Sequence, residues 1–200
     1  MDYLSLFRMP TPVKITGRSS SITNAFINSI IPVVQPSAEQ IRQALEILGM
    51  TPETFGCAYC GDKVSEWDHL RPLVKNKKPT GHISEIHNLV PSCGKCNQSK
   101  GNKEWKIWIV SKASLSPATR RIPDIEERIK SLEAYEKWGE PTKMDFEAIV
   151  GKEIWSHHQQ NLERVQSLMR ESQELAAKIN SRVSHAYESL GRTRTAAEKI

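Results

Sequence analysis

The chain has 200 residues, of which 38% are apolar and 26% are charged, and it carries a formal net charge of +5. This length predicts one or two globular domains. The longest apolar run, IIPVV, is interrupted by Pro32, and the first ten residues contain an Asp and an Arg, so we expect neither a membrane span nor a signal peptide. We therefore expect a cytoplasmic protein whose four cysteines are reduced.

Residues 1–52 predict an N-terminal helical region. The segment VKIT is typical of a short strand, and apolar residues spaced four apart from Ile22 onward predict a short helix that Pro32 ends. Further on, Ser37 and Gln40 form a capping-box pattern ahead of an amphipathic segment that ends at a glycine. This segment predicts a second helix.

Residues 53–112 are rich in turns and contain all four cysteines. Short apolar pieces predict a β-hairpin and loops between Cys57 and Cys96, and a helix is expected to begin near Cys96 and continue through KEWKIWIV, with a bend at Gly101. Ten Lys and Arg residues stand against five Asp and Glu residues in 61–112. This positive charge suits a polyanion such as nucleic acid, although a solvated lysine-rich loop has the same composition.

Residues 113–200 predict a C-terminal helical region. One amphipathic helix is expected over DIEERIKSLEAYEKWG, and a much longer helix is expected from Trp155 onward. Apolar residues recur there at alternating steps of three and four up to Leu190, which is the spacing of a coiled coil. Two interpretations stay open: the helix packs on its own subunit, or it is a dimerisation arm.

Two Cys-x-x-Cys pairs, Cys57 with Cys60 and Cys93 with Cys96, predict a metal site. The two-residue gap lets both sulfurs of a pair face one ion, and two pairs complete the tetrahedral coordination of structural zinc. Such a closed site does not activate water, so its expected role is to hold together the ends of the segment between the pairs. Disulfides, or two pairs without metal, are the alternative.

Four polar residues within or just after this segment point to chemistry: Asp68, His69, Asn88 and Asn97. A carboxylate at Asp68 and an amide at Asn97 offer oxygen ligands to a hard cation such as Mg²⁺. His69 follows Asp68 on an extended stretch, so it is expected on the opposite face of the strand. An imidazole with a pKa near neutrality suits removal of a proton from water.

The stretches EWDHLRP and IHNLVPSCGKCNQSKG resemble the HNH endonuclease family, a branch of the ββα-metal nucleases, in its subtype with two zinc-binding Cys pairs. The resemblance covers about residues 57–108. Together with the expected helices, it implies an α+β fold in which a mainly helical chain surrounds a small zinc-stabilised ββα-metal module and ends in a long helix.

The resemblance also implies a role for each residue. Asp68 would bind a catalytic Mg²⁺ or Mn²⁺ ion, and His69 would be the general base. Asn88 would hydrogen-bond the backbone near His69. Asn97 stands where many members have a His and would be a second metal ligand, while Lys100 would face the phosphate backbone. The four cysteines would hold structural Zn²⁺.

Arg71, Lys95 and Arg18 are further candidates for contacts with nucleic acid. A structural salt bridge is an alternative role for Arg71, and a capped turn is an alternative explanation of the sequence around Arg18. His82 and His87 compete with His69 for the role of base. We expect His82 at the surface and His87 as a loop residue that forms a hydrogen bond.

These observations predict a metal-dependent endonuclease that cuts double-stranded DNA as a homodimer, at a specific sequence as restriction enzymes do. A nicking or nonspecific HNH nuclease of the homing or phage type is one alternative. A zinc-containing nucleic-acid-binding module without catalysis is another, but it would need only the thiolates and the basic surface. The presence of Asp68, His69 and Asn97 together favours an enzyme.

Overall fold

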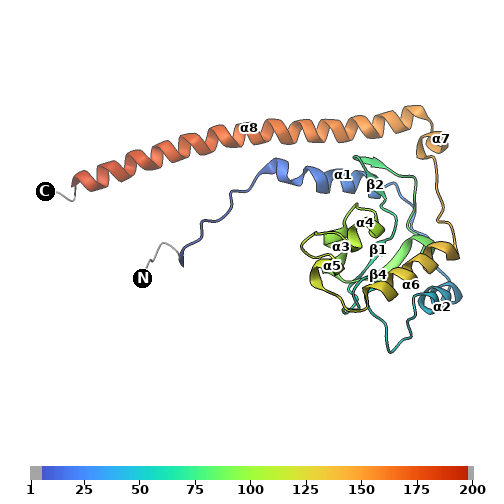
Figure 1. The fold of residues 1–200 in the computed structure, drawn as a ribbon. Coiled ribbons are helices and arrows are strands. Elements are labelled where there is room, and N and C mark those ends of the chain that lie inside the picture. The colour runs from blue at the N-terminus through green and yellow to red at the C-terminus, as the bar shows by residue number, and fades with distance from the viewer. Residues whose placement is uncertain (1–5, 198–200) are drawn as a thin grey trace. The chain divides into compact units, whose positions relative to one another are not determined.

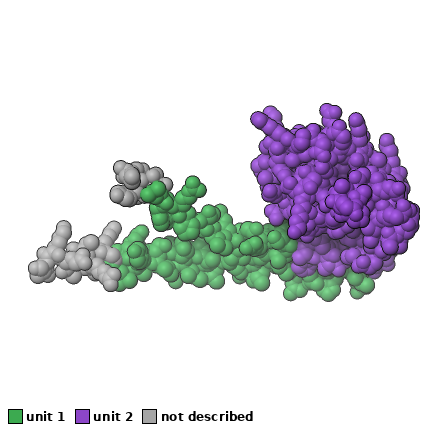
Figure 2. All heavy atoms as spheres, turned by 90° about the horizontal axis from the view of Figure 1, so that it is seen from below, with its two compact units in different colours: residues 1–23, 152–200 green, residues 24–151 purple. Residues whose placement is uncertain are grey.

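The computed structural model describes residues 6–197, with side chains for residues 6–190 (Figure 1). This part of the chain is mainly helical and has two small sheets. The chain separates into two compact units, one of residues 24–151 and the other of residues 1–23 together with 152–200 (Figure 2). The predicted domain boundaries near residues 52 and 112 both fall inside the 24–151 unit.

A ββα arrangement forms the centre of the 24–151 unit. In chain order it comprises β1 (Glu66–His69), the hairpin of β2 (Val74–Lys75) and β3 (Lys78–Pro79), the 3-10 helix η3 (Ile86–Asn88), β4 (Leu89–Ser92) and α3 (Gly94–Lys100). Strands β1 and β4 pair antiparallel, with Asp68 opposite Val90 and His69 opposite Leu89. The expectation of hairpin and loop structure between the Cys pairs is confirmed.

The helix predicted from Cys96 through residue 110 is in fact two helices. Helix α3 ends at Lys100, and α4 (Trp105–Ile109) begins only after a short loop. Gly101 has a φ of 50°, a backbone region that favours glycine, so it ends the helix and does not merely bend it. After this break, Trp105 and Trp108 are buried in the core.

Helices α2 (Ala38–Ile47), α5 (Pro117–Arg120) and α6 (Ile125–Trp138) have residues buried in the same unit, whereas α7 (Phe146–Val150) has no buried residue. The predicted capping box starts α2, since Ser37 Oγ accepts from the Gln40 backbone N–H and the Gln40 side chain accepts from the Ser37 N–H. Ala44 of α2 and Leu132 and Tyr135 of α6 share one apolar core with the four cysteines. Segments on both sides of the Cys-rich region therefore build the same core.

Helix α1 (Ser19–Asn28) is anchored by a second apolar cluster. Ile27 and Ile31 are buried there together with Leu73, Val74 and Ile83. The side chains near β2 therefore hold the end of α1 and the turn that follows it.

The segment after α1 is also hydrogen-bonded to the region between the strands. Val34 N–H donates to the carbonyl of Ser84 over 2.8 Å, and Ser84 N–H donates to the carbonyl of Pro32 over 3.1 Å. Ser84 is thus fixed by backbone bonds on both sides.

The other unit contains the 3-10 helix η2 (Ile15–Arg18) and the long helix α8 (Lys152–Ala197). The prediction of a strand at VKIT is wrong. Ile15 N–H donates to the side chain of Gln173 on α8 over 2.7 Å, and Gly17 N–H donates to the carbonyl of Lys14, so neither N–H is paired with a strand. The long C-terminal helix is confirmed.

The apolar stripe of α8 changes along its length. Trp155 is half-buried and Leu162 is buried, and the stripe stays partly covered as far as Ala176. Beyond that point Ile179 is 54% exposed and Val183 is 62% exposed. One helix therefore contains a part that packs within its own chain and a part that lies open.

None of the described helices, α8 included, combines the length and the apolar character that crossing a membrane requires.

Candidate active site and zinc centre

The four cysteines meet at one point of the core. All four are buried, their Sγ atoms lie within 4.8 Å of one another, and the sulfurs of Cys60 and Cys93 are 3.7 Å apart. A tetrahedral zinc ion with Zn–S distances of about 2.3 Å needs sulfurs about 3.8 Å apart, whereas a disulfide needs about 2.05 Å. The cysteines are free thiols in an arrangement that fits structural zinc, and the alternative of disulfides does not hold.

Hydrogen bonds within the cluster shift the pKa values of its thiols in opposite directions, and those with Cys57 and Cys60 raise the pKa of Cys96. Hydrogen bonds from Cys60 and Cys96 lower the pKa of the Cys57 thiol to about 3, so that this sulfur is charged at neutral pH. Arg120 donates from Nη1 to Sγ of Cys96 over 3.4 Å. A guanidinium beside a cluster of thiolates offsets part of their mutual repulsion.

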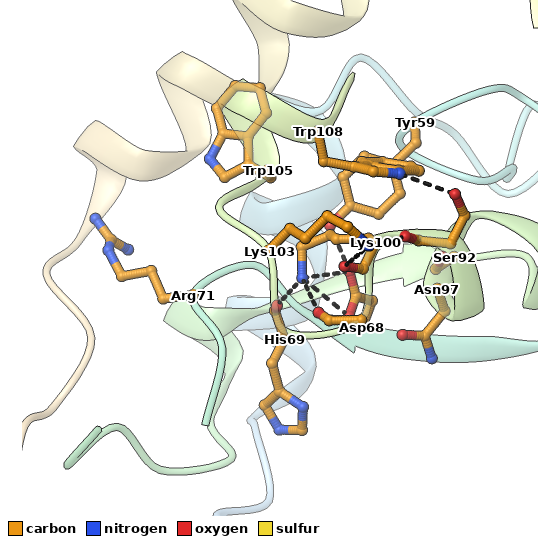
Figure 3. Close-up of polar contacts among 12 residues, drawn as sticks. Tyr59, Asp68, His69, Arg71, Ser92, Asn97, Lys100, Lys103, Trp105 and Trp108 are labelled. Carbon is orange, nitrogen blue, oxygen red and sulfur yellow. Dashed lines mark hydrogen bonds and ion pairs between the residues drawn. The ribbon is translucent and has the colours of Figure 1, made fainter. Parts of the chain in front are cut away.

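Asp68 lies on β1 and is only 5% exposed. The hydroxyl of Tyr59 donates to Oδ2 of Asp68 over 2.6 Å, and Nζ of Lys100 lies 3.0 Å from the same oxygen and 3.3 Å from Oδ1 (Figure 3). Burial raises the pKa of Asp68, and the positive charge of Lys100 opposes that rise. Two buried donors thus fix the carboxyl group in place.

Lys100 does not face the phosphate backbone as the resemblance implied. Its side chain is 0% exposed, and besides Asp68 its Nζ donates to the backbone carbonyl of His69 over 2.7 Å. A buried ammonium group is tolerated only with an anionic partner, and Asp68 supplies one. Lys100 therefore joins the end of α3 to β1, and its position is a correction to the predicted nucleic-acid contact.

The ring of His69 points away from the Asp68–Lys100 pair (Figure 3). Its Nε2 lies 2.8 Å from Oγ of Ser84. Burial, and to a smaller extent the charge of Lys100, lowers the pKa of His69 to about 4, so the ring is neutral at pH 7. When Nε2 carries the proton, it donates to Ser84 and leaves the lone pair of Nδ1 for another proton donor.

Asn97, on α3, is oriented by Glu66. Its Nδ2 donates to Oε2 of Glu66 over 2.7 Å. Because this bond engages the nitrogen end of the amide, Oδ1 is the end left for a ligand. An amide oxygen is a suitable ligand for a hard divalent cation.

Asp68, His69 and Asn97 line one cavity of about 130 Å³. Two of these three predicted residues bring oxygen atoms to it, and oxygen is the donor that Mg²⁺ and Mn²⁺ prefer. The donor types therefore fit a hard divalent cation beside a neutral imidazole.

Asn88 is fully buried next to the loop that follows β1. Its Oδ1 accepts from the Arg71 N–H over 2.8 Å and its Nδ2 donates to the Arg71 carbonyl over 3.1 Å. Its own carbonyl accepts from the N–H of Leu70. These three bonds hold the backbone directly after His69.

The other predicted contacts with nucleic acid have diverse surroundings. Arg71 is half-buried, with Nη2 3.9 Å from Glu136. Lys95 is 66% exposed and lies 3.9 Å from Asp62. Arg18 is exposed and belongs to the other compact unit.

The competing histidines do not line the cavity of His69. His82, expected at the surface, is half-buried, and burial lowers its pKa. The ring of His87 lies 4.3 Å from that of Trp138, and its buried Nδ1 has no hydrogen-bond partner among the described residues. The expectation that His87 forms a loop hydrogen bond is therefore not met at that nitrogen.

Four residues of the site were not predicted: Tyr59, Glu66, Ser84 and Arg120. A signal existed for Glu66, which stands two residues before Asp68 and so shares its face of the strand. Tyr59 lies in the turn between Cys57 and Cys60, and this turn brings its hydroxyl to Asp68. Ser84 and Arg120 gave no signal, since no local spacing rule predicts contacts over 15 and 24 residues.

Comparison with known proteins identifies the segment that carries this geometry. Residues 57–103 match the family model described as HNH endonuclease. The CRISPR-associated endonuclease Cas9 of Corynebacterium diphtheriae is 43% identical over 56 residues, which is 26% of this chain and 5% of that protein. The chain thus matches only a small part of this relative's length. No solved structure shows significant similarity to the chain. On this match and this geometry, residues 57–103 form a domain of the HNH endonuclease family.

Proposed function

We propose that the chain is a metal-dependent endonuclease that hydrolyses phosphodiester bonds of DNA. The observation that supports this most is that Asp68, His69 and Asn97 line one cavity within a domain of the HNH family. A zinc-containing binding module without catalysis is the second candidate. Nucleic-acid binding alone does not require a neutral imidazole and an oriented amide oxygen at the same cavity, so we favour the enzyme.

In the proposed mechanism His69 is the general base. Ser84 Oγ accepts a hydrogen bond from Nε2–H of His69, and Nδ1 removes a proton from the attacking water. Asp68 and Asn97 would hold Mg²⁺ or Mn²⁺, with Glu66 keeping the amide oxygen of Asn97 toward the ion. Such an ion, when bound, stabilises the charge that develops on the scissile phosphate and on the leaving oxygen. Zn²⁺ on the four cysteines has a structural role.

We further propose a restriction-type enzyme that recognises a specific sequence and cuts both strands as a homodimer. The exposed part of the α8 stripe, around Ile179 and Val183, offers a surface for a second copy. Lys95 and Arg18 are exposed and remain proposed phosphate contacts. Reduced cysteines are consistent with a cytoplasmic location.

Plasmid cleavage tests this function. Purified protein is incubated with supercoiled plasmid and Mg²⁺ or Mn²⁺, beside His69→Ala and beside His157→Ala, a control at an exposed histidine of α8. The wild type and the control should cut, and His69→Ala should lose cleavage at least about 100-fold, the usual size of general-base catalysis.

Sequencing of the ends separates the subtypes. Discrete fragments with one recurring end sequence support the restriction-type enzyme, whereas nicks or a smear support a nicking or nonspecific nuclease. Equal cleavage by wild type and His69→Ala would reject His69 as the base. Binding without cleavage would favour the second candidate.

A further inference from the structure

Two residues from outside the family match line the same cavity as His69. They are Asn24 and Asn28 of α1, which face it together with Asn97 and with Asn102 of the loop after α3. Residues four apart lie on one face of a helix, so the two α1 side chains reach the cavity from adjacent turns. All of them belong to the 24–151 unit.

The fold makes no use of these two amides. Among the described residues, neither the Asn24 nor the Asn28 side chain forms a hydrogen bond, although Asn24 is half-buried. An amide group carries two donor hydrogens and an acceptor oxygen. Asn28 is exposed, and no side-chain atom of Asn24 is among the buried polar atoms that lack a partner, so water reaches both amides and the fold requires neither of them.

Helix α1 holds the two amides in a fixed place. Ile27 is 2% exposed and Ile31 is 7% exposed, both within the apolar cluster next to β2. In the segment that follows α1, the carbonyl of Pro32 and the N–H of Val34 form hydrogen bonds with the backbone of Ser84. The hydroxyl of Ser84 in turn contacts His69. The same short segment thus positions the proposed base and the two free amides.

The chemistry of the cavity indicates what these amides bind. No Lys or Arg side chain lines it, and besides Asp68 and His69 its polar side chains are the amides of Asn24, Asn28, Asn97 and Asn102. A polyanionic substrate therefore meets amides here in place of cations. Asn side chains donate to phosphate and sugar oxygens, and they pair with base edges.

We propose that Asn24 and Asn28 hold the nucleotide beside the scissile phosphate, so that α1 completes the substrate site of the HNH domain. This inference rests on the proposed nuclease function. It predicts that sequence outside residues 57–103 helps to determine how tightly, or at which bases, the enzyme engages its substrate.

The first test is steady-state plasmid cleavage by the double variant Asn24→Ala, Asn28→Ala. Loss of two hydrogen bonds should raise KM by about 5- to 100-fold with a smaller change in kcat. The matched control is Asn180→Ala, an exposed asparagine on α8. Asn28→Asp keeps the shape, removes the donors and adds a charge that repels phosphate, so it should raise KM as well.

Sequenced ends refine the result. A uniform loss at all sites indicates sugar-phosphate contacts, and a changed base preference next to the cut indicates contacts with base edges; both support the proposal. Wild-type KM together with unchanged end sequences in the double variant overturns it, while cleavage by the wild type leaves the nuclease function intact.

If the wild type does not cut DNA, a binding measurement tests whether Asn24 and Asn28 contact the nucleic acid. Fluorescence anisotropy of a labelled DNA duplex is measured with His69→Ala, with and without the two Asn→Ala changes. Weaker binding of the triple variant supports the role of the amides even where the nuclease function fails. Equal binding, or no binding by either protein, overturns it.

Discussion

Asn97 donates its side-chain amide to Glu66, which stands 31 residues earlier on the paired strand, over 2.7 Å. This bond selects the orientation of the amide, and so it determines that oxygen and not nitrogen is presented to the cavity. A residue that does not line the cavity thereby controls a proposed metal ligand.

Glu66→Ala should therefore lower cleavage about 10- to 100-fold, the range found when outer partners of metal ligands are removed. The loss should shrink at high Mg²⁺, because the altered quantity is the affinity for the ion. Glu66→Gln keeps an acceptor oxygen and should restore most of the activity. Glu46→Ala, on the exposed side of α2, serves as the control. Equal metal dependence in wild type and Glu66→Ala would contradict this role.

Lys100→Met tests the buried ion pair. Without the ammonium group, Asp68 remains in the core with only Tyr59 as a donor, and the free energy of unfolding should fall by about 3–5 kcal/mol. Urea denaturation measures this change. Lys103→Met, an exposed lysine three residues later, should leave stability nearly unchanged.

A second substitution makes the test of Lys100 sharper. Asp68→Asn combined with Lys100→Met removes both charges and should recover part of the lost stability, although not the activity. If Lys100→Met alone unfolds at the wild-type urea concentration, the ion pair of Lys100 and Asp68 does not stabilise the fold.

Ser84→Ala removes the partner of His69 Nε2. The ring would lose its orientation and its preferred tautomer, so kcat should fall about tenfold while the unfolding free energy changes by only about 1 kcal/mol. Single-turnover cleavage measures the chemical step. Ser29→Ala, whose hydroxyl bonds the backbone of α1 at the surface, is the matched control. An unchanged single-turnover rate would show that Ser84 does not orient the base.

Cys93→Ser should abolish stoichiometric zinc binding and cooperative unfolding, because the four sulfurs close the core that α2 and α6 share. Metal analysis and thermal denaturation with a chelator measure both effects. His69→Ala should keep one zinc per chain and a wild-type melting profile. A soluble Cys93→Ser protein that still unfolds cooperatively without zinc would overturn the structural role of the ion.

Ile179→Asp combined with Val183→Asp tests the proposed dimer. Both side chains are exposed within the chain, so the double variant should keep the wild-type fold but sediment as a monomer of 22.7 kDa. Asn180→Ala should leave the sedimentation mass unchanged. If the double variant and the wild type have the same mass, this part of α8 does not form the dimer.

Local patterns predicted the local features well. The capping box of Ser37 and Gln40, the periodicity of α8 and the spacing of the cysteines each depend on neighbours in the sequence, and each appears in the structure. VKIT failed as a strand because Gln173, far away in the chain, provides a bond to Ile15 that no local rule includes.

Tertiary pairing explains the remaining errors in the site. A lysine in a basic segment predicts a surface position, but Lys100 is drawn into the core by Asp68. Ser84 and Glu66 orient His69 and Asn97, and of these two residues only Glu66 had a signal in the sequence, its place two residues before Asp68. The motif thus located the reactive groups, and only the fold revealed how they are held.

The backbone bonds between Ser84 and the segment Pro32–Val34 limit how far the segment that matches the HNH family can be transplanted. A fragment cut at the limits of the family match would keep His69, the cysteines and Asn97. It would lose the segment that is hydrogen-bonded to Ser84, and it would also lose Ala44 and Tyr135, which pack in the apolar core. Residues 57–103 therefore depend on contacts from the rest of the 24–151 unit, and a transplanted segment would need those contacts replaced.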